Sequence, residues 1–190
     1  MGSLLSPLPW LATLGLSLQF VTSMLTTLPA SLLMVKFGRR PIFTAGVLIA
    51  ALATFTQGIA ILLMDFTLFC VGSMCLGIAQ GCAGFYRYAA ADSAEDTQKP
   101  RAISYVLAGG LLAAFLGPEI ARNAVGLVPG HLYAGCFFSI AFLQIFSFIT
   151  LSGVDIPKPN RTQSGGRPIN AFFKMPIFIV GAISAAIGYA

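Results

Sequence analysis

One carboxylate, that of Glu119, lies well inside an apolar stretch of the sequence. A charged group at such depth costs free energy in lipid unless it faces protein, water or a counter-ion, so acids of this kind often mark proton or ion pathways. Glu119 directly follows Pro118, whose ring frees a backbone carbonyl from its helical hydrogen bond. One interpretation makes Glu119 a proton or cation carrier. The other pairs it with Arg122, one helical turn further on, and the sequence leaves both open.

Other polar side chains inside apolar stretches must also find partners. Four of them are glutamines, namely Gln19, Gln57, Gln80 and Gln144. Arg87 lies at the end of an apolar stretch, where its guanidinium can reach lipid headgroups along its alkyl stem. A gating or coupling role is the alternative for Arg87, and Asp92 is close enough in sequence to pair with it.

Catalytic and metal chemistry finds few ligands in this chain. His131 is its only histidine, so neither a histidine-based metal cluster nor a Ser-His-Asp triad is expected. The four cysteines have no CxxC spacing and lie in apolar stretches, where free thiols are expected: Cys70, Cys75, Cys82 and Cys136. The sequence also lacks a Gly-rich phosphate loop with a following Lys. We therefore expect no catalytic residue, no cofactor and no metal, and no enzymatic activity.

The elements that position these side chains are expected to be membrane-spanning helices. Of 190 residues, 57% are hydrophobic and 9% are charged, whereas a soluble domain has about 25% charged residues. A helix that crosses a bilayer needs roughly 20 apolar residues. Five stretches approach or exceed that length: 9–35, 41–63, 66–89, 102–125 and 132–151. A sixth stretch begins near Met175. The sequence thus predicts an all-α integral membrane protein, with about six transmembrane helices.

The cations lie in alternate breaks between these stretches. If the break after the first stretch faces the cytoplasm, ten of the eleven Lys and Arg residues lie on that side and only Arg122 lies outside. Such asymmetry is typical of membrane proteins, whose cytoplasmic loops are enriched in Lys and Arg. The net charge of +5 therefore indicates topology. We expect a lipid bilayer as partner and no nucleic acid.

The first break, "SLLMVKFGRRP" at residues 31–41, resembles the loop signature of the major facilitator superfamily. Four residues match that signature: Lys36, Gly38, Arg39 and Arg40. Val35 stands where the family usually has Asp. In the family this acid belongs to a charge relay that stabilises one state of the transporter, so that part of the mechanism is not expected at Val35.

Two further stretches resemble the same family. "GIAQGCAG", residues 77–84, is similar to the signature of the fourth family helix, although Gly77 replaces an Arg that is often tied to proton coupling. "AGGLLAAFLGPEIA", residues 108–121, resembles the Gly-Pro signature of the fifth helix, which is common in exporters. Gly117 and Pro118 match it.

Small residues recur every four positions in two of the stretches. One series is Ser73, Gly77 and Gly81, and the other is Gly109, Ala113, Gly117 and Ala121. Such stripes let helix backbones approach closely in lipid, so we expect them to be packing faces. The alternative is that these stripes, together with Pro118, form a hinge or sliding face as a carrier changes state.

The resemblance implies secondary transport of a small organic solute by alternating access. Export coupled to a proton gradient, as in an antiporter, is the favoured form. Gln19 and Gln80 fall in helices that line the path in this family, and Arg87 and Glu119 are further path candidates. Gln57 and Gln144 fall in outer scaffold helices, where bonds between helices are expected.

The resemblance runs from the second family helix into the seventh, so the chain is expected to be a fragment. Residues 1–153 are expected to form an incomplete amino-terminal helix bundle, 154–174 a cytoplasmic linker, and 175–190 the start of the next half. The partner is then the remaining half or a second chain, in a bacterial inner membrane. The alternative is a truncated, non-transporting membrane protein that acts as a scaffold or assembly partner.

Overall fold

The computed structural model describes residues 2–95, 97–153, 180 and 184. The chain divides into a unit of Met1–Pro159 and a second of Asn160–Ala190, and the helices named below all belong to the first. The expected linker lies outside the described residues, and so does the expected sixth span apart from residues 180 and 184.

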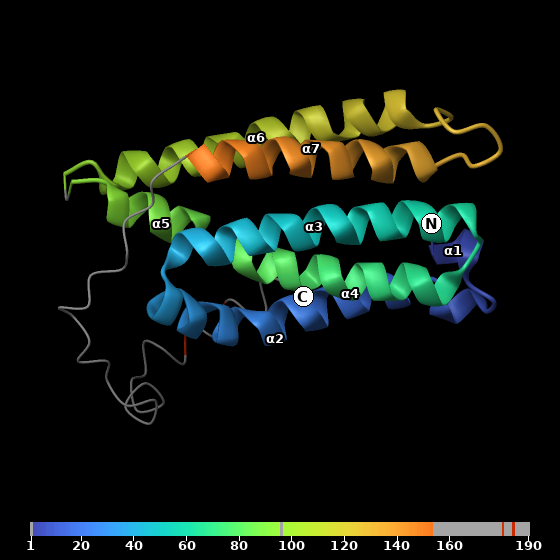
Figure 1. The fold of residues 1–190 in the computed structure, drawn as a ribbon, viewed down its shortest axis with the longest axis horizontal. Coiled ribbons are helices and arrows are strands. Elements are labelled where there is room, and N and C mark those ends of the chain that lie inside the picture. The colour runs from blue at the N-terminus through green and yellow to red at the C-terminus, as the bar shows by residue number, and fades with distance from the viewer. Residues whose placement is uncertain (1, 96, 154–179, 181–183, 185–190) are drawn as a thin grey trace. The chain divides into compact units, whose positions relative to one another are not determined.

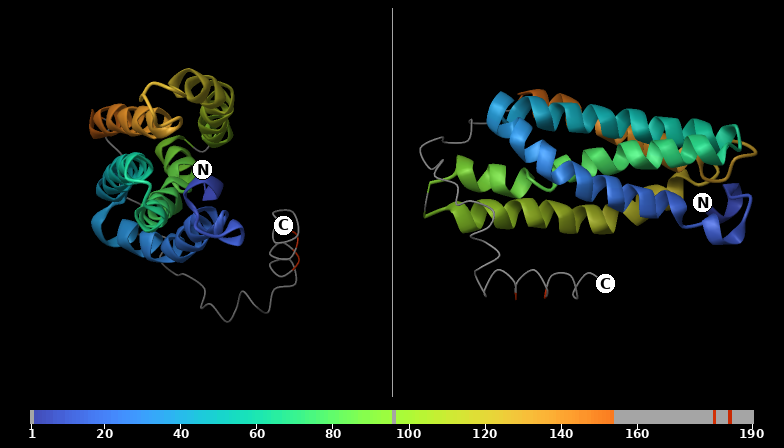
Figure 2. Two further views of the ribbon diagram at one scale, coloured as in Figure 1. Left: turned by 90° about the vertical axis from the view of Figure 1, so that its right-hand side faces the viewer. Right: turned by 90° about the horizontal axis from the view of Figure 1, so that it is seen from below.

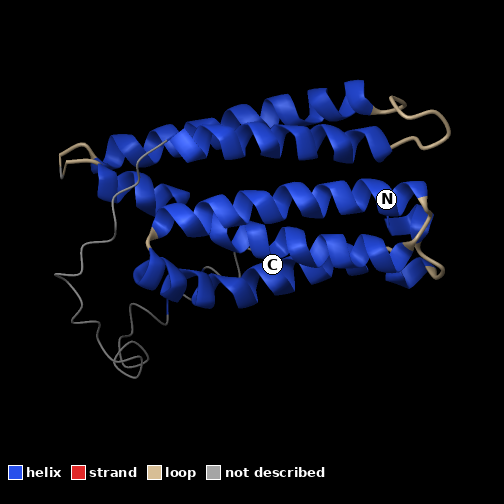
Figure 3. Cartoon of the chain, in the orientation of Figure 1, coloured by secondary structure: helices blue, strands red, loops and turns tan. Residues whose placement is uncertain are grey.

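The regular elements of the described residues are all helical (Figure 3). They are α1 (Gly2–Leu5), the 3-10 helix η1 (Pro9–Leu11), α2 (Leu14–Phe37), α3 (Arg39–Leu62), α4 (Phe66–Ala83), α5 (Tyr86–Ser93), α6 (Lys99–Ala124) and α7 (Ala134–Gly153). Five segments are long and apolar enough to cross a membrane: Pro9–Phe37, Arg39–Leu62, Phe66–Ser93, Lys99–Ala124 and Ala134–Gly153. The prediction of an all-α membrane protein is confirmed, and five of the expected spans are present in the described part.

The third span differs from the single helix expected over 66–89. It is divided into α4 and α5: the Gly84 amide still donates to the Gln80 carbonyl, and the helical hydrogen-bond ladder is interrupted at Phe85. The Phe85 amide donates to the Cys82 carbonyl in a tighter turn, and regular helix resumes at Tyr86. The break lies close to Gln80, and therefore near the polar residues considered below.

One residue, Gly38, joins α2 to α3. Its backbone has φ 93° and ψ 166°, a conformation that side chains with a Cβ rarely adopt, and its amide donates to the Met34 carbonyl over 3.0 Å. Glycine in the "KFGRR" break is thus required by the sharpness of the turn. The turn between α3 and α4 ends at a side-chain cap instead. The Asp65 carboxylate caps α4 by accepting a hydrogen bond from the Leu68 amide.

Helix α4 lies between α2 and α3, and α3 packs in turn against α7 (Figure 1). Helix α6 contacts α5 and α7, and the end-on view shows α6 and α7 on one side of α2, α3 and α4 (Figure 2). Among the five spans, α3 is the most buried and α6 the least. The core of the described part is therefore built around α3 and α4.

The two glycine stripes have different surroundings. A Cβ on Gly77 would lie 1.9 Å from Thr22 Oγ1, and one on Gly81 would lie 2.8 Å from the Ser23 carbonyl oxygen. The α4 stripe is therefore the surface on which α2 packs. At Gly109 and Gly117 a Cβ would meet nothing within 4 Å, so the neighbour expected for the α6 stripe is not supplied by the described residues. The reason is that α6 contacts only α5 and α7 extensively.

Candidate functional site

A hollow of about 320 Å³ lies between helices of the bundle. Helices α2, α3, α4, α5 and α7 all contribute to its wall. Its polar residues are Gln19, Gln80, Tyr86 and Gln144, and most of the rest of the wall is made of small or apolar residues of α3 and α4. No Asp, Glu, Lys, Arg or His side chain of the described residues lines it. The hollow is thus polar but uncharged, in a volume typical of small-molecule pockets.

Two of these glutamines are bonded to each other across helices. Gln19 Nε2 of α2 donates to Gln80 Oε1 of α4 over 2.9 Å. The close approach of the helices at Gly77, one turn before Gln80, allows this contact, because a Cβ there would lie 2.3 Å from the Gln19 carbonyl oxygen. The glycine stripe therefore positions the amide pair.

The position of Gln144 differs from the outer scaffold face expected for it. It lines the same hollow as Gln19 and Gln80, because α7 packs against α3 and turns this side chain toward the Val47 and Ala50 wall. Gln80 and Gln144 each lie near the middle of their spans. Membrane carriers commonly bind substrate at that depth.

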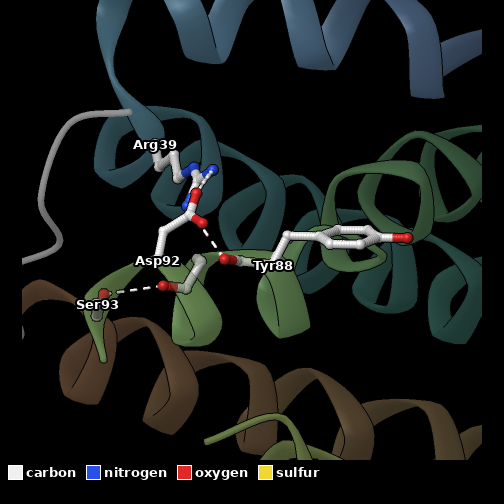
Figure 4. Close-up of polar contacts among 5 residues, drawn as sticks. Arg39, Tyr88, Asp92 and Ser93 are labelled. Carbon is white, nitrogen blue, oxygen red and sulfur yellow. Dashed lines mark hydrogen bonds and ion pairs between the residues drawn. The ribbon is translucent and has the colours of Figure 1, made fainter. Parts of the chain in front are cut away.

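The two arginines of the "KFGRR" break connect α3 to two distant helices. Arg39 Nη2 lies 2.5 Å from Asp92 Oδ2, and Arg39 Nη1 donates to the Tyr88 carbonyl over 3.3 Å (Figure 4). Arg40 Nη2 donates to the Ser152 carbonyl at the end of α7. Lys36 lies in the last turn of α2, with Nζ 5.2 Å from the Phe37 ring centroid. The two arginines therefore link the start of α3 to the ends of α5 and α7.

Asp92 does not pair with Arg87, as the sequence had suggested, but with Arg39. Arg87 is exposed and its guanidinium lies 5.0 Å from the centroid of the Tyr88 ring. Figure 4 shows that this ring points away from the ion pair. Arg87 does not line the uncharged hollow.

Glu119 lies in a local cluster on α6. Arg122 Nη2 donates to Glu119 Oε1 over 2.7 Å, and Asn123 Nδ2 donates to the same oxygen over 3.2 Å. The two charged side chains are 53% and 76% exposed, and Pro118 is inside the helix just before them. The geometry agrees with the pairing interpretation, and Glu119 lies outside the hollow.

Gln57 joins α3 to α4 and lies outside the hollow. Its Nε2 donates to Ser73 Oγ over 3.0 Å, and the Ser73 hydroxyl donates to the Phe69 carbonyl. Gln57 is 3% exposed, and its Oε1 has no hydrogen-bond partner among the described residues. This is a bond between helices, the role expected for Gln57.

Metal ligands do not gather in the part of the chain that the structure describes, where no three His, Cys, Asp or Glu residues form a cluster. The four cysteines are free thiols. The described residues can therefore bind a ligand in the hollow by hydrogen bonds and apolar contact, and their ion pairs lie near helix ends.

Comparison with known proteins gives a consistent result. A family model described as Major Facilitator Superfamily matches residues 8–190. A protein from Brucella anthropi named as a riboflavin transporter is 35% identical over 193 aligned residues, which cover 100% of this chain and 48% of that relative. The chain thus spans about half the length of the relative it matches. No solved structure matches the chain.

Proposed function

Because the chain belongs to the Major Facilitator Superfamily, we propose that it forms part of a carrier that moves a small organic solute across a membrane by alternating access. The chain is an integral, multi-pass membrane protein with five spans in its described part. The uncharged hollow near the middle of these spans is the observation that carries the proposal. In it, Gln19 and Gln80 serve as substrate contacts.

A flavin or a similar flat heterocycle is the proposed solute class. The relative from Brucella anthropi is named as a riboflavin transporter, and it is 35% identical to this chain. The hollow supports a neutral aromatic solute, because its polar groups are amides and a phenol set among apolar side chains. Pockets of this composition orient ligands through a few polar groups and bind them through apolar contact.

A proton gradient is the proposed energy source, since the sequence has no phosphate loop for a nucleotide. Export is the proposed direction, and it rests on the resemblance of residues 108–121 to the Gly-Pro signature of exporters. The "GRR" cations are proposed to hold α3, α5 and α7 together as one body while the carrier changes state, because Arg39 and Arg40 bond to both neighbours.

The test uses the full-length protein reconstituted into liposomes. Riboflavin flux is followed by fluorescence with and without an imposed pH gradient. We expect flux above that of empty liposomes, accelerated by the gradient and reduced in Gln80→Leu. Equal riboflavin flux in protein-containing and empty liposomes contradicts riboflavin transport by this protein. Flux that ignores the gradient contradicts proton coupling alone.

A further inference from the structure

We propose that the uncharged hollow recognises the neutral cis-amide or imide edge of a heterocycle, and that Gln144 contributes to this recognition. The inference rests on the proposed transport function and specifies the chemistry of the same site. An edge of this kind presents an N–H donor beside a carbonyl acceptor, as found in lactams, pyrimidine-diones and the imide ring of flavins.

The amide pair of Gln19 and Gln80 supplies the complementary groups. Gln19 Nε2 donates to Gln80 Oε1, which uses one donor and one acceptor. Within the described residues, Gln19 Oε1 and Gln80 Nε2 make no hydrogen bond with another side chain. The pair thus keeps at least one free acceptor, Gln19 Oε1, and one free donor, Gln80 Nε2, for a ligand. If both amides were rotated by 180°, the pair would still leave one donor and one acceptor, so the result does not depend on the assignment of oxygen and nitrogen.

The described residues that line the hollow favour a neutral ligand edge. None of the described residues that line it is ionised at neutral pH. A carboxylate or ammonium placed there would find no counter-ion among these residues to offset the hydration that it loses. A neutral amide edge replaces its water with two protein hydrogen bonds, and a ligand that lacks the N–H leaves a pocket acceptor unpaired.

Gln144 and the α3 wall complete the recognition surface. Gln144 is half-buried, and its amide has no hydrogen-bond partner among the described residues. It therefore offers a third hydrogen-bonding group from α7. One wall of the same hollow is made of small, apolar residues of α3, against which a flat ring can lie: Gly46, Val47 and Ala50.

The experiment compares riboflavin with 3-methylriboflavin, in which the imide N–H is replaced by N–CH3. Both are titrated onto the purified full-length protein, and binding is read from flavin fluorescence. We expect the methylated compound to bind about tenfold more weakly, because one hydrogen bond is lost and its pocket acceptor is left unpaired. In Gln19→Leu and Gln80→Leu this ratio should fall toward one. Gln144→Leu should weaken riboflavin binding several-fold.

Gln98→Leu is the matched control, because this exposed amide lies at the start of α6, outside the hollow, and makes no side-chain cap. It should keep the tenfold ratio. Equal binding of the two flavins by the unaltered protein overturns the amide-edge inference while the transport proposal stands. If neither flavin binds, the proposed solute and the inference both fall. The ratio of the two flavin affinities in the unaltered protein tests the amide-edge inference even if a leucine variant does not fold.

Discussion

A Cβ placed on Gly77 of α4 would lie 1.9 Å from Thr22 Oγ1 of α2. This contact sets the distance between the two helices beside the Gln19–Gln80 hydrogen bond. Gly77→Ala should therefore force α2 away from α4 and destabilise the protein by about 1–3 kcal/mol, as overpacking of a tight interface does. The measurement is the apparent melting temperature of the purified protein, together with riboflavin binding, which should weaken.

Gly110→Ala is the control for Gly77→Ala, because a Cβ on Gly110 would meet nothing within 4 Å among the described residues. It adds the same methyl group to an apolar span and gains helix propensity of up to about 1 kcal/mol. Its melting temperature should be unchanged or higher. An equal loss of stability in the two variants would show that the α2–α4 contact at Gly77 is not special.

Gln57→Met should be tolerated, in contrast to Gln57→Ala. Methionine has the length and unbranched shape of glutamine, and it removes a buried Oε1 that has no partner among the described residues. The Ser73 hydroxyl keeps its bond to the Phe69 carbonyl. Removing an unpaired buried acceptor offsets the loss of one neutral hydrogen bond, whereas alanine leaves a cavity and should cost about 2 kcal/mol or more.

The same melting assay tests the Gln57 pair of variants. Gln57→Met should lie close to the unaltered protein and well above Gln57→Ala. Riboflavin binding should be the same in Gln57→Met and in the unaltered protein, because Gln57 lies outside the hollow. A methionine variant as unstable as the alanine variant would show that the amide itself is required.

Arg39 and Asp92 should show coupling in a double-mutant cycle. Arg39→Gln and Asp92→Asn each break the ion pair, and the double variant should lose less stability than the sum of the two. We expect a coupling free energy of about 1 kcal/mol, since Asp92 is half exposed and Arg39 is mostly covered. High salt should reduce this coupling free energy. The cycle of Arg39→Gln with Glu95→Gln is the control and should show simple additivity.

Glu119→Gln should leave gradient-driven flux intact. Glu119 is paired with Arg122 and Asn123 on an exposed face of α6 and does not line the hollow. Loss of such a pair should cost less than about 1 kcal/mol of stability. The measurement is riboflavin flux with and without a pH gradient, and Arg122→Gln should behave alike. If Glu119→Gln alone abolishes the effect of the gradient, Glu119 carries the proton.

The helices could be predicted from the sequence because each span depends only on its own hydropathy. The ends of Arg39–Leu62 and Ala134–Gly153 lie within a few residues of the expected ones, since the bilayer demands a fixed apolar length. The break at Gly84 could not be found in this way. A single glycine inside an apolar span is common in membrane helices and does not by itself mark a break, and Gly84 has helical dihedral angles.

The candidate site was harder to predict, because it depends on how each helix is rotated toward its neighbours. The resemblance assigned Gln19 and Gln80 to path-lining helices, which stays a prediction, and the structure brings their amides together. Gln144 was missed, because only the packing of α7 on α3 shows which way it faces. Arg39 and Asp92 are far apart in sequence, and local spacing therefore pointed to Arg87 instead.

The single-residue turn at Gly38 also bears on how the chain enters the bilayer during its synthesis. Two apolar spans joined by one residue emerge from the ribosome as a helical hairpin. Lys36, Arg39 and Arg40 keep its bend on one side, because each cation would add about 2.5–3.5 kcal/mol if it crossed. If this bend stays in the cytoplasm, as the loop charges predict, the turn that must cross is Leu63–Asp65, which carries one charge. We therefore expect α2 and α3 to insert together as a helical hairpin, before α4 packs between them.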